Sequence, residues 1–333
     1  MRVRLVTPYY HVPRGNSITV RRIAQGLKTF HIEVEVVSLD SEQILEESNA
    51  DLIHGFHAYR FCAYLENQKT ARQPYIVTLT GTDLNYDLSN RERKEKVRNT
   101  LIGAKAVHVF SEGDKSRLLQ HLPAVQNKTV IIPQGVGDFA IQESHFRKEA
   151  GTFVILLPAG IRKVKNIPAA ISMLEPLHME MPNIRLWICG PVIEEEEWSK
   201  VQMLIRRNQD WIEYIGQVPH AEMGALYRCA DLVLNTSLAE GQPAALLEAM
   251  YLGIPVVASN IPGNRSILVN EETGLLYHDE KEFIRYCKTI MFDVSFKNDL
   301  ISRAMAYVRT KHTAEKEIQA FISLYQGILS SVR

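Results

Sequence analysis

Residues 231–268 read DLVLNTSLAEGQPAALLEAMYLGIPVVASNIPGNRSIL and set the architecture expected for the whole chain. The apolar residues Leu232 to Asn235 predict a short strand. A polar loop with one glycine follows and ends at Pro243, a residue suited to the first turn of a helix. We expect this helix from about Ala244 to Leu252, and Ile254 to Ala258 predict the next strand. The segment is therefore a strand–loop–helix–strand unit of a parallel sheet.

Two glutamates flank the start of this helix. In parallel sheets, ligands bind outside the carboxyl ends of the strands, which is where Glu240 and Gly241 fall. Glu248 lies further along the helix, and each carboxylate can accept two hydrogen bonds from a diol. A pair of merely solvated glutamates is the structural alternative. A helix N-terminus also offers unpaired N–H groups and a partial positive charge. We therefore expect a phosphate or a sugar to be held by the backbone of Gln242, Pro243, Ala244 and Ala245.

Three further motifs accompany the glutamate pair, namely GTDLNYD at 81–87, GIRKVKN at 160–166 and NIPGN at 260–264. Together they resemble the retaining GT-B glycosyltransferases of family 4, also called glycosyltransferase group 1, in which a Glu-x7-Glu pair opens a helix beneath a nucleotide sugar. The motifs are spread over most of the 333 residues. The resemblance implies an α/β protein of the GT-B fold, with two Rossmann-like, doubly wound parallel-sheet domains facing a central cleft. It also implies retention of the anomeric configuration.

Length and composition agree with two globular domains, because 333 residues exceed the usual size of a single core. The 38 basic and 38 acidic residues balance, so nothing marks a nucleic-acid partner. We predict an N-terminal, acceptor-side domain over 1–138, a linker over 139–151 and a C-terminal, donor-binding domain over 152–313. By resemblance, a last helix over 314–333 packs back on the N-terminal domain.

The cysteines and the apolar runs indicate the compartment. The four cysteines lie far apart and form no Cys-x-x-Cys pair, so neither a zinc site nor a disulfide framework is indicated. No apolar run approaches the roughly 18 residues that a membrane span needs. We therefore expect a cytoplasmic protein without a transmembrane segment and without a cofactor. The oligomeric state is left open.

The N-terminal half alternates strands and helices. The loop after its first strand, PYYHVPRGNS, lacks the Gly-x-Gly-x-x-Gly of a dehydrogenase, so NAD is not expected. Gly15 is either a glycine that lets the backbone approach a diphosphate, a role that resembles the family's N-terminal loop, or a plain turn glycine. Strands are predicted at Val3–Thr7, Val34–Leu39, Leu52–His54, Tyr75–Thr80, Ala106–Phe110 and Thr129–Ile132, with helices at 17–29 and near 58–69, 89–102 and 112–121.

The acceptor-side candidates are Thr80, Asp83 and His57. Asp83 follows the fourth strand and can either cap a helix or bind an acceptor hydroxyl. The family tends to place a histidine where Thr80 stands. His54 and His57 are nearby candidates for that role, with a purely structural histidine as the alternative.

The second half repeats the alternation. In the resembled family, the turn containing Gly190 and the loop containing Val218 line the pocket for the nucleotide base, which backbone groups would contact. Strands are predicted at Phe153–Pro158, Ile184–Cys189, Ile212–Ile215 and Gly274–Tyr277, with helices near 167–179, 194–206, 280–291, 295–309 and 314–330.

The chain contains no Asp-x-Asp, the usual carboxylate pair for a metal that bridges a sugar-nucleotide diphosphate. Positive side chains must then neutralise the leaving diphosphate. Arg162 and Lys165 follow the first strand of the second domain, the topological position for that task. A solvated loop is the alternative.

We therefore predict a retaining, metal-independent glycosyltransferase of the hexosyl type. It moves a sugar from a nucleotide donor, expected to be a UDP-sugar, to an acceptor that the sequence does not identify. Glu240, Arg162 and Lys165 are the predicted catalytic residues. Two alternatives stay open: a sugar-nucleotide epimerase or other reaction on the same fold, and a non-catalytic nucleotide-sugar-binding module.

Overall fold

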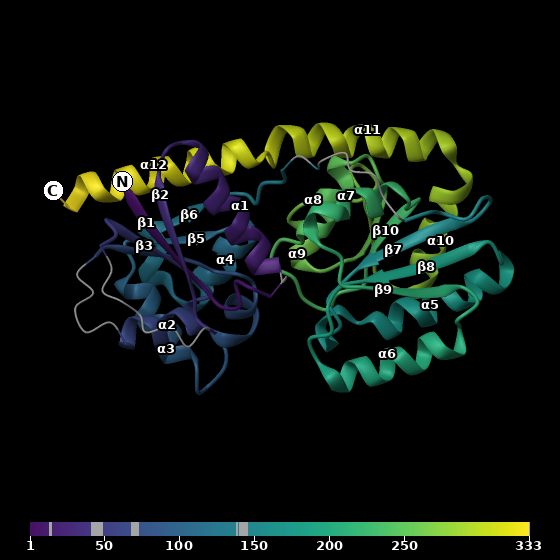
Figure 1. Ribbon diagram of the computed structural model, residues 1–333, viewed down its shortest axis with the longest axis horizontal. Coiled ribbons are helices and arrows are strands. Elements are labelled where there is room, and N and C mark those ends of the chain that lie inside the picture. The colour runs from purple at the N-terminus through teal and green to yellow at the C-terminus, as the bar shows by residue number, and fades with distance from the viewer. Residues whose placement is uncertain (13–14, 41–48, 68–72, 138, 140–145, 333) are drawn as a thin grey trace. The chain divides into compact units, whose positions relative to one another are not determined.

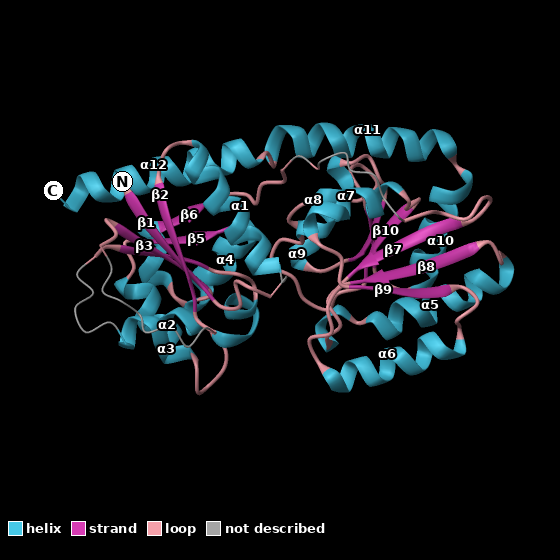
Figure 2. Ribbon diagram, in the orientation of Figure 1, coloured by secondary structure: helices cyan, strands magenta, loops and turns pink. Residues whose placement is uncertain are grey.

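The computed structural model describes residues 1–12, 15–40, 49–67, 73–137, 139 and 146–332 (Figure 1). The chain divides into two compact units: Met1–Gly137 together with Lys311–Arg333, and Asp138–Thr310. Each unit is built on one six-stranded parallel sheet with helices on both faces (Figure 2). The predicted α/β fold with two doubly wound sheets is thereby confirmed. Within the predicted linker, residues 140–145 lie outside the described residues.

In the first unit the strand order is β2-β1-β3-β4-β5-β6, so the sheet reverses its direction of growth between β1 and β3. Its elements are β1 (Arg2–Thr7), α1 (Gly15–Thr29), β2 (Glu33–Ser38), β3 (Leu52–Phe56), α2 (Ala58–Asn67), β4 (Tyr75–Thr78), the π-helical turn Asp83–Asp87, α3 (Lys94–Gly103), β5 (Ala106–Val109), α4 (Glu112–His121), the 3-10 turn Pro123–Lys128, β6 (Thr129–Ile131) and α12 (Ala314–Val332).

Both faces of this sheet are buried, which explains why its strands read as nearly continuous apolar runs. Leu5 of β1 packs in the core formed with α1 and α12, whereas its neighbour Val6 packs in the core formed with α2, α3 and α4. The helix α12 lies along α1 (Figure 1). Arg22 of α1 donates two hydrogen bonds of 2.7 and 2.9 Å to Glu317 of α12. These contacts make the C-terminal helix part of the first unit.

In the second unit the order is β12-β11-β10-β7-β8-β9, and the reversal falls between β7 and β10. Figure 2 shows α5 and α6 on one side of this sheet and α7 and α8 on the other. The elements are β7 (Phe153–Pro158), the 3-10 turn Lys163–Lys165, α5 (Ile167–Glu180), β8 (Ile184–Cys189), α6 (Glu195–Arg207), β9 (Ile212–Gly216), α7 (His220–Arg228), β10 (Leu232–Asn235), α8 (Ala244–Tyr251), β11 (Val256–Ser259), α9 (Pro262–Arg265), β12 (Leu275–Tyr277), α10 (Glu280–Phe292) and α11 (Val294–Lys311).

The strand–loop–helix–strand unit predicted from residues 231–268 is confirmed as β10, α8 and β11. The two strands are parallel neighbours, with Val233 opposite Val256. Leu246, Leu247 and Met250 of α8 are fully buried against the sheet. The unit therefore holds the loop between β10 and α8 at the carboxyl edge of the sheet.

Several elements differ from the sequence-based expectation, and two of the differences have a clear physical reason. The helix α7 was not predicted, because it is short and contains Gly224, which lowers helix propensity. The helix expected from residue 89 begins at Lys94, because the Asn90 side chain accepts hydrogen bonds from the N–H groups of Glu92 and Arg93 and forms a turn instead. None of the helices in the described ranges has the length and apolar character needed to cross a bilayer.

Candidate functional site

The loops after β7 and β10 leave adjacent strands of the second sheet at the point where the strand order reverses. In open parallel sheets, ligands bind in the crevice at this point. The loop after β7 carries Arg162 and Lys165, and the loop after β10 carries Glu240. Leu238 N–H donates to the Val164 carbonyl at 2.8 Å, so the two loops are hydrogen-bonded to each other. The fold thus places the loop of Arg162 and Lys165 beside the loop of Glu240, although nearly eighty positions separate the two loops in the sequence.

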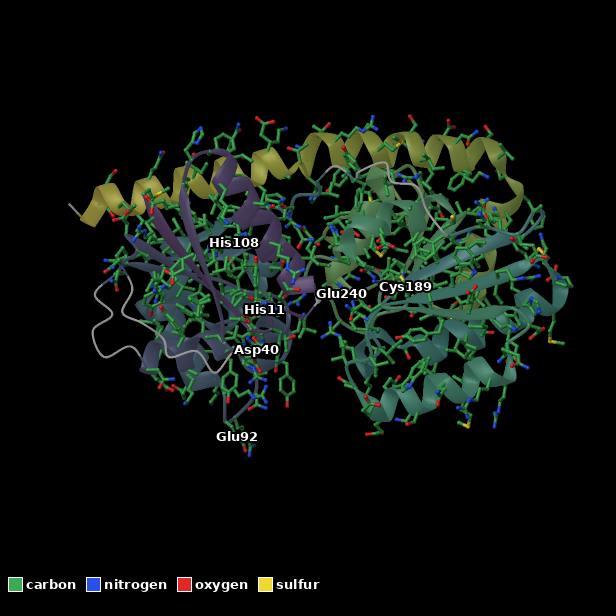
Figure 3. The ribbon with its side chains drawn as sticks, in the orientation of Figure 1. His11, Asp40, Glu92, His108, Cys189 and Glu240 are labelled. Atoms are coloured by element: carbon green, nitrogen blue, oxygen red, sulfur yellow. The ribbon has the colours of Figure 1, made fainter. Side chains whose placement is uncertain are left out.

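Lys165 and Glu240 form a partly buried ion pair, with 2.5 Å between Nζ and Oε1. Their side chains are 16% and 10% exposed. The same carboxylate oxygen accepts hydrogen bonds from Ser237 Oγ at 2.6 Å and from Asn235 Nδ2 at 3.2 Å. Burial acts to raise the pKa of Glu240, but the Lys165 charge and the three hydrogen bonds outweigh it and lower the pKa below its ordinary value. Glu240, labelled in Figure 3, is therefore an ionised carboxylate at neutral pH.

The NIPGN motif packs against the Glu240 loop. A Cβ on Gly263 would lie 2.5 Å from the Gly241 carbonyl oxygen and 2.6 Å from that of Glu240, so only glycine allows this approach. Asn264 Nδ2 donates to Asn235 Oδ1 at 3.1 Å. Asn235 in turn donates to Glu240. The motif therefore fixes both the backbone and the hydrogen-bond partners of the carboxylate.

Arg162 differs from Lys165 in having no partner. Its Nε is buried and makes no hydrogen bond, and the described part of the chain gives its guanidinium no ion pair. A buried donor left without an acceptor costs free energy, and natural proteins keep few of them. At this crevice, an anionic ligand would satisfy the arginine.

Glu248 lies on α8 and is also buried. Its Oε1 is 3.0 Å from His220 Nε2, and its Oε2 accepts a hydrogen bond of 2.9 Å from the Tyr227 hydroxyl. The two glutamates of the sequence motif therefore have separate partners: Glu240 pairs with Lys165, and Glu248 with His220 and Tyr227. The sequence singled out neither His220 nor Tyr227, because both contacts join residues that are more than 20 positions apart.

The remaining donor-side candidates are mostly backbone positions. Gly190 has a φ of +147°, and a Cβ there would lie 2.3 Å from the Ala159 carbonyl oxygen, so packing alone explains this glycine. Gly15 begins α1 with no positive φ and with open space where a Cβ would lie. Nothing in its conformation requires glycine. Residues 242–245 form the entry to α8, with Pro243 as its N-cap.

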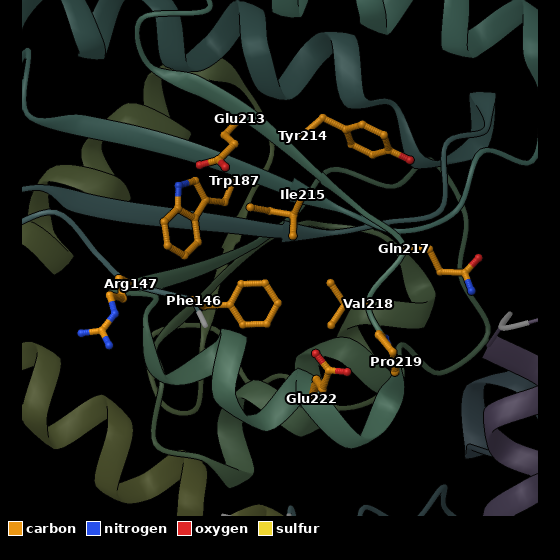
Figure 4. Close-up of a pocket in the computed structure, with 10 residues that line it drawn as sticks. All are labelled: Phe146, Arg147, Trp187, Glu213, Tyr214, Ile215, Gln217, Val218, Pro219 and Glu222. Carbon is orange, nitrogen blue, oxygen red and sulfur yellow. The ribbon is translucent and has the colours of Figure 1, made fainter. Parts of the chain in front are cut away.

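Val218 lines a cavity of about 500 Å³ on one face of the second sheet, beside β9 (Figure 4). Trp187 and Glu213 are register partners on β8 and β9, so their side chains leave the sheet on the same face and form part of its wall. Phe146 lies across from Val218 in this view. Val218 therefore forms part of the cavity wall, and its contact with a nucleotide base stays a prediction.

On the first unit, Asp83 is fully buried. Its Oδ2 accepts a hydrogen bond of 2.9 Å from Ala58 N–H, at the start of α2, and its Oδ1 accepts one of 2.8 Å from Thr80 N–H. Burial raises the pKa of Asp83, although these N–H groups oppose the shift. In this structure Asp83 therefore acts as a helix-capping residue that joins two loops. An acceptor-binding role for it stays a prediction.

His57 and Thr80 stand at the carboxyl ends of β3 and β4. His57 has a φ of +70°, a strained conformation for a residue other than glycine. Its Nε2 lies 3.9 Å from Asp87 Oδ2. In the described residues, His57 Nδ1, Thr80 Oγ1 and Asp87 Oδ2 are buried polar atoms without hydrogen-bond partners. Asp87, the second aspartate of the GTDLNYD motif, was not predicted as a site residue.

No group of three or more His, Cys, Asp or Glu side chains is placed to hold a metal ion in the ranges that the structure describes.

Comparison with known proteins identifies the family. Residues 138–306 match the model of the family "Glycosyl transferases group 1". The chain is 30% identical over 328 residues to glycosyltransferase 1 domain-containing protein 1 of Xenopus tropicalis, with 93% of each chain covered. It is 27% identical over 199 residues to a D-inositol 3-phosphate glycosyltransferase of Pseudarthrobacter chlorophenolicus, covering 56% of this chain and 47% of that protein.

Two solved structures have the same fold over nearly the whole chain. Sucrose-phosphate synthase from Thermosynechococcus elongatus superposes with a TM-score of 0.82 at 17% identity, covering 99% of this chain and all of that one. Anabaena HepE in complex with UDP and glucose gives a TM-score of 0.81 at 17% identity, covering 98% of this chain and all of that one. The chain therefore has the GT-B fold and belongs to the glycosyl transferases group 1 family, as the sequence motifs predicted.

Proposed function

We propose that this chain transfers a sugar, of the hexosyl type, from a UDP-sugar to an acceptor, with retention of the anomeric configuration. The observation that carries the proposal is the pair of loops at the carboxyl edge of the second sheet, where the ionised Glu240 is paired with Lys165 and Arg162 has a buried Nε without a partner in the described residues. The Anabaena neighbour holds UDP and glucose, and the pneumococcal O-GlcNAc transferase GtfA, a more partial structural match, holds UDP and GlcNAc. Retention rests on the family resemblance.

Glu240 is assigned to the donor sugar. A carboxylate accepts hydrogen bonds from hydroxyl groups, and its hydrogen bonds are stronger than those of neutral acceptors. Its Oε1 accepts the contacts with Lys165, Ser237 and Asn235, which hold the carboxylate in one orientation. The loop position is fixed by Gly263, so the carboxylate is preorganised for the sugar before it binds.

Arg162 and Lys165 are assigned to the leaving diphosphate. As the bond between the anomeric carbon and the diphosphate oxygen breaks, the electron pair leaves with the oxygen and negative charge builds on the phosphate. Fixed cations therefore stabilise the transition state more than the ground state. Arg162 is free for this task, whereas Lys165 must share its charge between Glu240 and the phosphate. The N-terminus of α8 adds backbone N–H groups and a partial positive charge.

On the first unit, Thr80 and His57 are assigned to the acceptor side. Their unpartnered atoms lie at strand ends, where a hydroxyl-bearing ligand would supply the missing hydrogen bonds. The acceptor itself stays unidentified. Metal independence is part of the proposal, because the cations of the second unit occupy the position where the diphosphate charge must be neutralised.

A thermal-shift screen of UDP, ADP, GDP, CDP and their sugars tests the donor assignment. A ligand present at 100 times its Kd stabilises the protein by about 2.7 kcal/mol, and we expect UDP and UDP-sugars to give the largest shift. Release of UDP from the stabilising sugar nucleotide then measures turnover. Conversion to another sugar nucleotide without UDP release would indicate an epimerase. Binding without any turnover would indicate a binding module. The absence of a thermal shift with every nucleotide would contradict the proposal.

A further inference from the structure

Each oxygen of the Glu248 carboxylate is held by a different neighbour from α7. The Tyr227 hydroxyl donates to Oε2 at 2.9 Å, and His220 Nε2 lies 3.0 Å from Oε1. A carboxylate oxygen can only accept, so the imidazole proton must be on Nε2. The carboxylate is thus fixed in two places by one helix.

The two neighbours differ in burial. Tyr227 is fully buried, and its hydroxyl also lies 3.2 Å from the Ala245 carbonyl oxygen. The His220 side chain is 47% exposed, against 10% for Glu248. Burial, and then the charge of Glu248, raise the pKa of the adjacent Cys189 thiol to about 12, so this thiol is neutral. The core therefore anchors one oxygen of Glu248, and a surface ring anchors the other.

The His220 ring is itself held in place. The Phe139 ring packs on it with 5.6 Å between the centroids. Gly224, one turn further along α7, leaves room for this phenyl group, because a Cβ there would lie 2.8 Å from Phe139 Cβ. The imidazole is therefore oriented by packing as well as by its hydrogen bond.

The two anchors leave a defined set of acceptor positions. A carboxylate has about four lone-pair sites, two on each oxygen. Tyr227 uses one site on Oε2, and His220 uses one on Oε1. As far as the described residues go, one acceptor site therefore stays open on each oxygen, and the two anchors keep the carboxylate from rotating. Two adjacent acceptors in a fixed orientation match the two O–H groups of a vicinal diol.

We propose that His220 is a positioning residue for Glu248, the carboxylate already expected from the sequence to accept hydrogen bonds from a diol, and that by fixing this carboxylate it lets the site select ribonucleotides against 2′-deoxyribonucleotides. The inference rests on the proposed function, since it concerns the nucleotide part of the same donor. Removing the 2′-hydroxyl leaves one oxygen of a buried carboxylate without its donor, which is costly only while the carboxylate is held in place. Without His220, Glu248 can turn and give both open sites to the 3′-hydroxyl and to water.

The test measures the Kd of UDP and of 2′-deoxy-UDP by calorimetry for four proteins. The native protein should bind UDP about tenfold or more tightly than the deoxy analogue, as expected for a hydrogen bond to a charged group. In His220→Ala the ratio should fall to within about threefold of unity. His220→Gln should restore most of it, because the amide N–H can reach the same oxygen. His278→Ala, an exposed histidine paired with Glu282 in the same unit, is the matched control and should leave the ratio unchanged.

The outcomes separate the two proposals. UDP binding with the same ratio in the native protein and in His220→Ala would overturn the positioning role and leave the proposed function intact. Failure of UDP to bind the native protein would overturn both. Because His220 is half exposed, His220→Ala should keep the native melting temperature. Tyr227→Phe provides a second arm, since freeing Oε2 should also lower the ratio while a purely structural tyrosine would change stability alone.

Discussion

The two units of this protein differ in where their buried polar groups lie relative to the sheet. In the second unit the partly buried charges of Lys165 and Glu240 lie at the carboxyl edge of the sheet, in loops that meet at the strand-order reversal, and the buried Glu248 lies on the following helix α8. In the first unit a buried polar chain runs through the middle of the sheet. His54 Nε2 is 2.6 Å from Thr78 Oγ1, which is 2.8 Å from His108 Nδ1.

The histidine chain of the first unit faces the C-terminal helix. His54 Nδ1 is 2.7 Å from the Tyr325 hydroxyl of α12, and His108, labelled in Figure 3, packs edge-on against Phe321. Both ring nitrogens of His54 and both of His108 have a partner, including His108 Nε2, which is 2.9 Å from the Ile132 carbonyl oxygen. We therefore expect the charges of the second unit to serve ligand chemistry, whereas this histidine chain of the first unit attaches α12. Substitutions and pH should therefore affect the two units differently.

The largest expected effect is on turnover in the second unit. Lys165→Ala should lower turnover by about 10²–10³, the usual cost of losing one preorganised charge donor. Chelator should not change the native rate. Lys163→Ala is the matched control, because Lys163 lies in the same 3-10 turn with an exposed side chain. UDP release in a steady-state assay measures both variants.

Two results would contradict this role of Lys165. Full activity of the Lys165→Ala variant would place the diphosphate charge elsewhere. Loss of activity in EDTA, restored by magnesium or manganese, would assign that charge to a metal. UDP affinity can be compared in the same two variants of the second unit. If it falls further in Arg162→Ala than in Lys165→Ala, Lys165 acts mainly through Glu240.

The second prediction concerns the support of the Glu240 loop. Gly263→Ala places a Cβ against two backbone carbonyl oxygens, which cannot move as a flexible side chain would. Since a displacement of about 1 Å in a catalytic loop can cost roughly 10² in rate, turnover should fall by about that factor. Gly327→Ala is the control, because nothing lies within 4 Å of a Cβ at that position in α12. Unchanged turnover in Gly263→Ala would show that the loop yields without cost.

The third prediction is an acid sensitivity confined to the first unit. Burial lowers the pKa of His108 to about 4 from an ordinary 6.5, and burial lowers that of His54 in the same direction. The unfolded state then binds protons first, so stability is complete above about pH 6.5 and falls as the pH drops from 6.5 towards 4. One pKa unit corresponds to about 1.4 kcal/mol, so His108 alone should cost on the order of 3 kcal/mol over this window.

The positions of the tryptophans allow the two units to be followed separately. All three, Trp187, Trp198 and Trp211, belong to the second unit. On acidification, hydrogen exchange should accelerate in peptides of β3 to β6 and α12 before tryptophan fluorescence changes. His108→Gln should weaken this pH dependence. Simultaneous loss of structure in both units, at the same pH in the native protein and in the variant, would contradict the assignment.

The sequence predicted the fold where strands are buried on both faces, because such strands read as apolar runs bounded by loops. It also singled out Glu240, Arg162 and Lys165, which follow strand ends in recognisable motifs, and Glu248 on the adjoining helix, and their roles stay predictions. The strand orders and the Lys165–Glu240 pair were not predicted, because periodicity within one segment does not determine which distant segments become neighbours. His220, Tyr227 and Asp87 were missed for the same reason. Asp83 left two roles open, and only its burial shows the capping contacts.

The smallest expected effect is at the first helix of the first unit. Gly15 has open space around a Cβ and a helical position, so Gly15→Ala should stabilise the protein by about 0.5–1 kcal/mol through helix propensity. If the backbone here approaches a diphosphate, the same methyl group should raise the Michaelis constant for the donor several-fold, whereas a glycine without function should leave it unchanged. Thermal unfolding and donor kinetics measured on one variant therefore separate the two alternatives that the sequence left open. A stabilised variant with native donor kinetics would remove Gly15 from the site and restrict donor recognition to the second unit, whereas a raised Michaelis constant would show that the first unit also contributes to it.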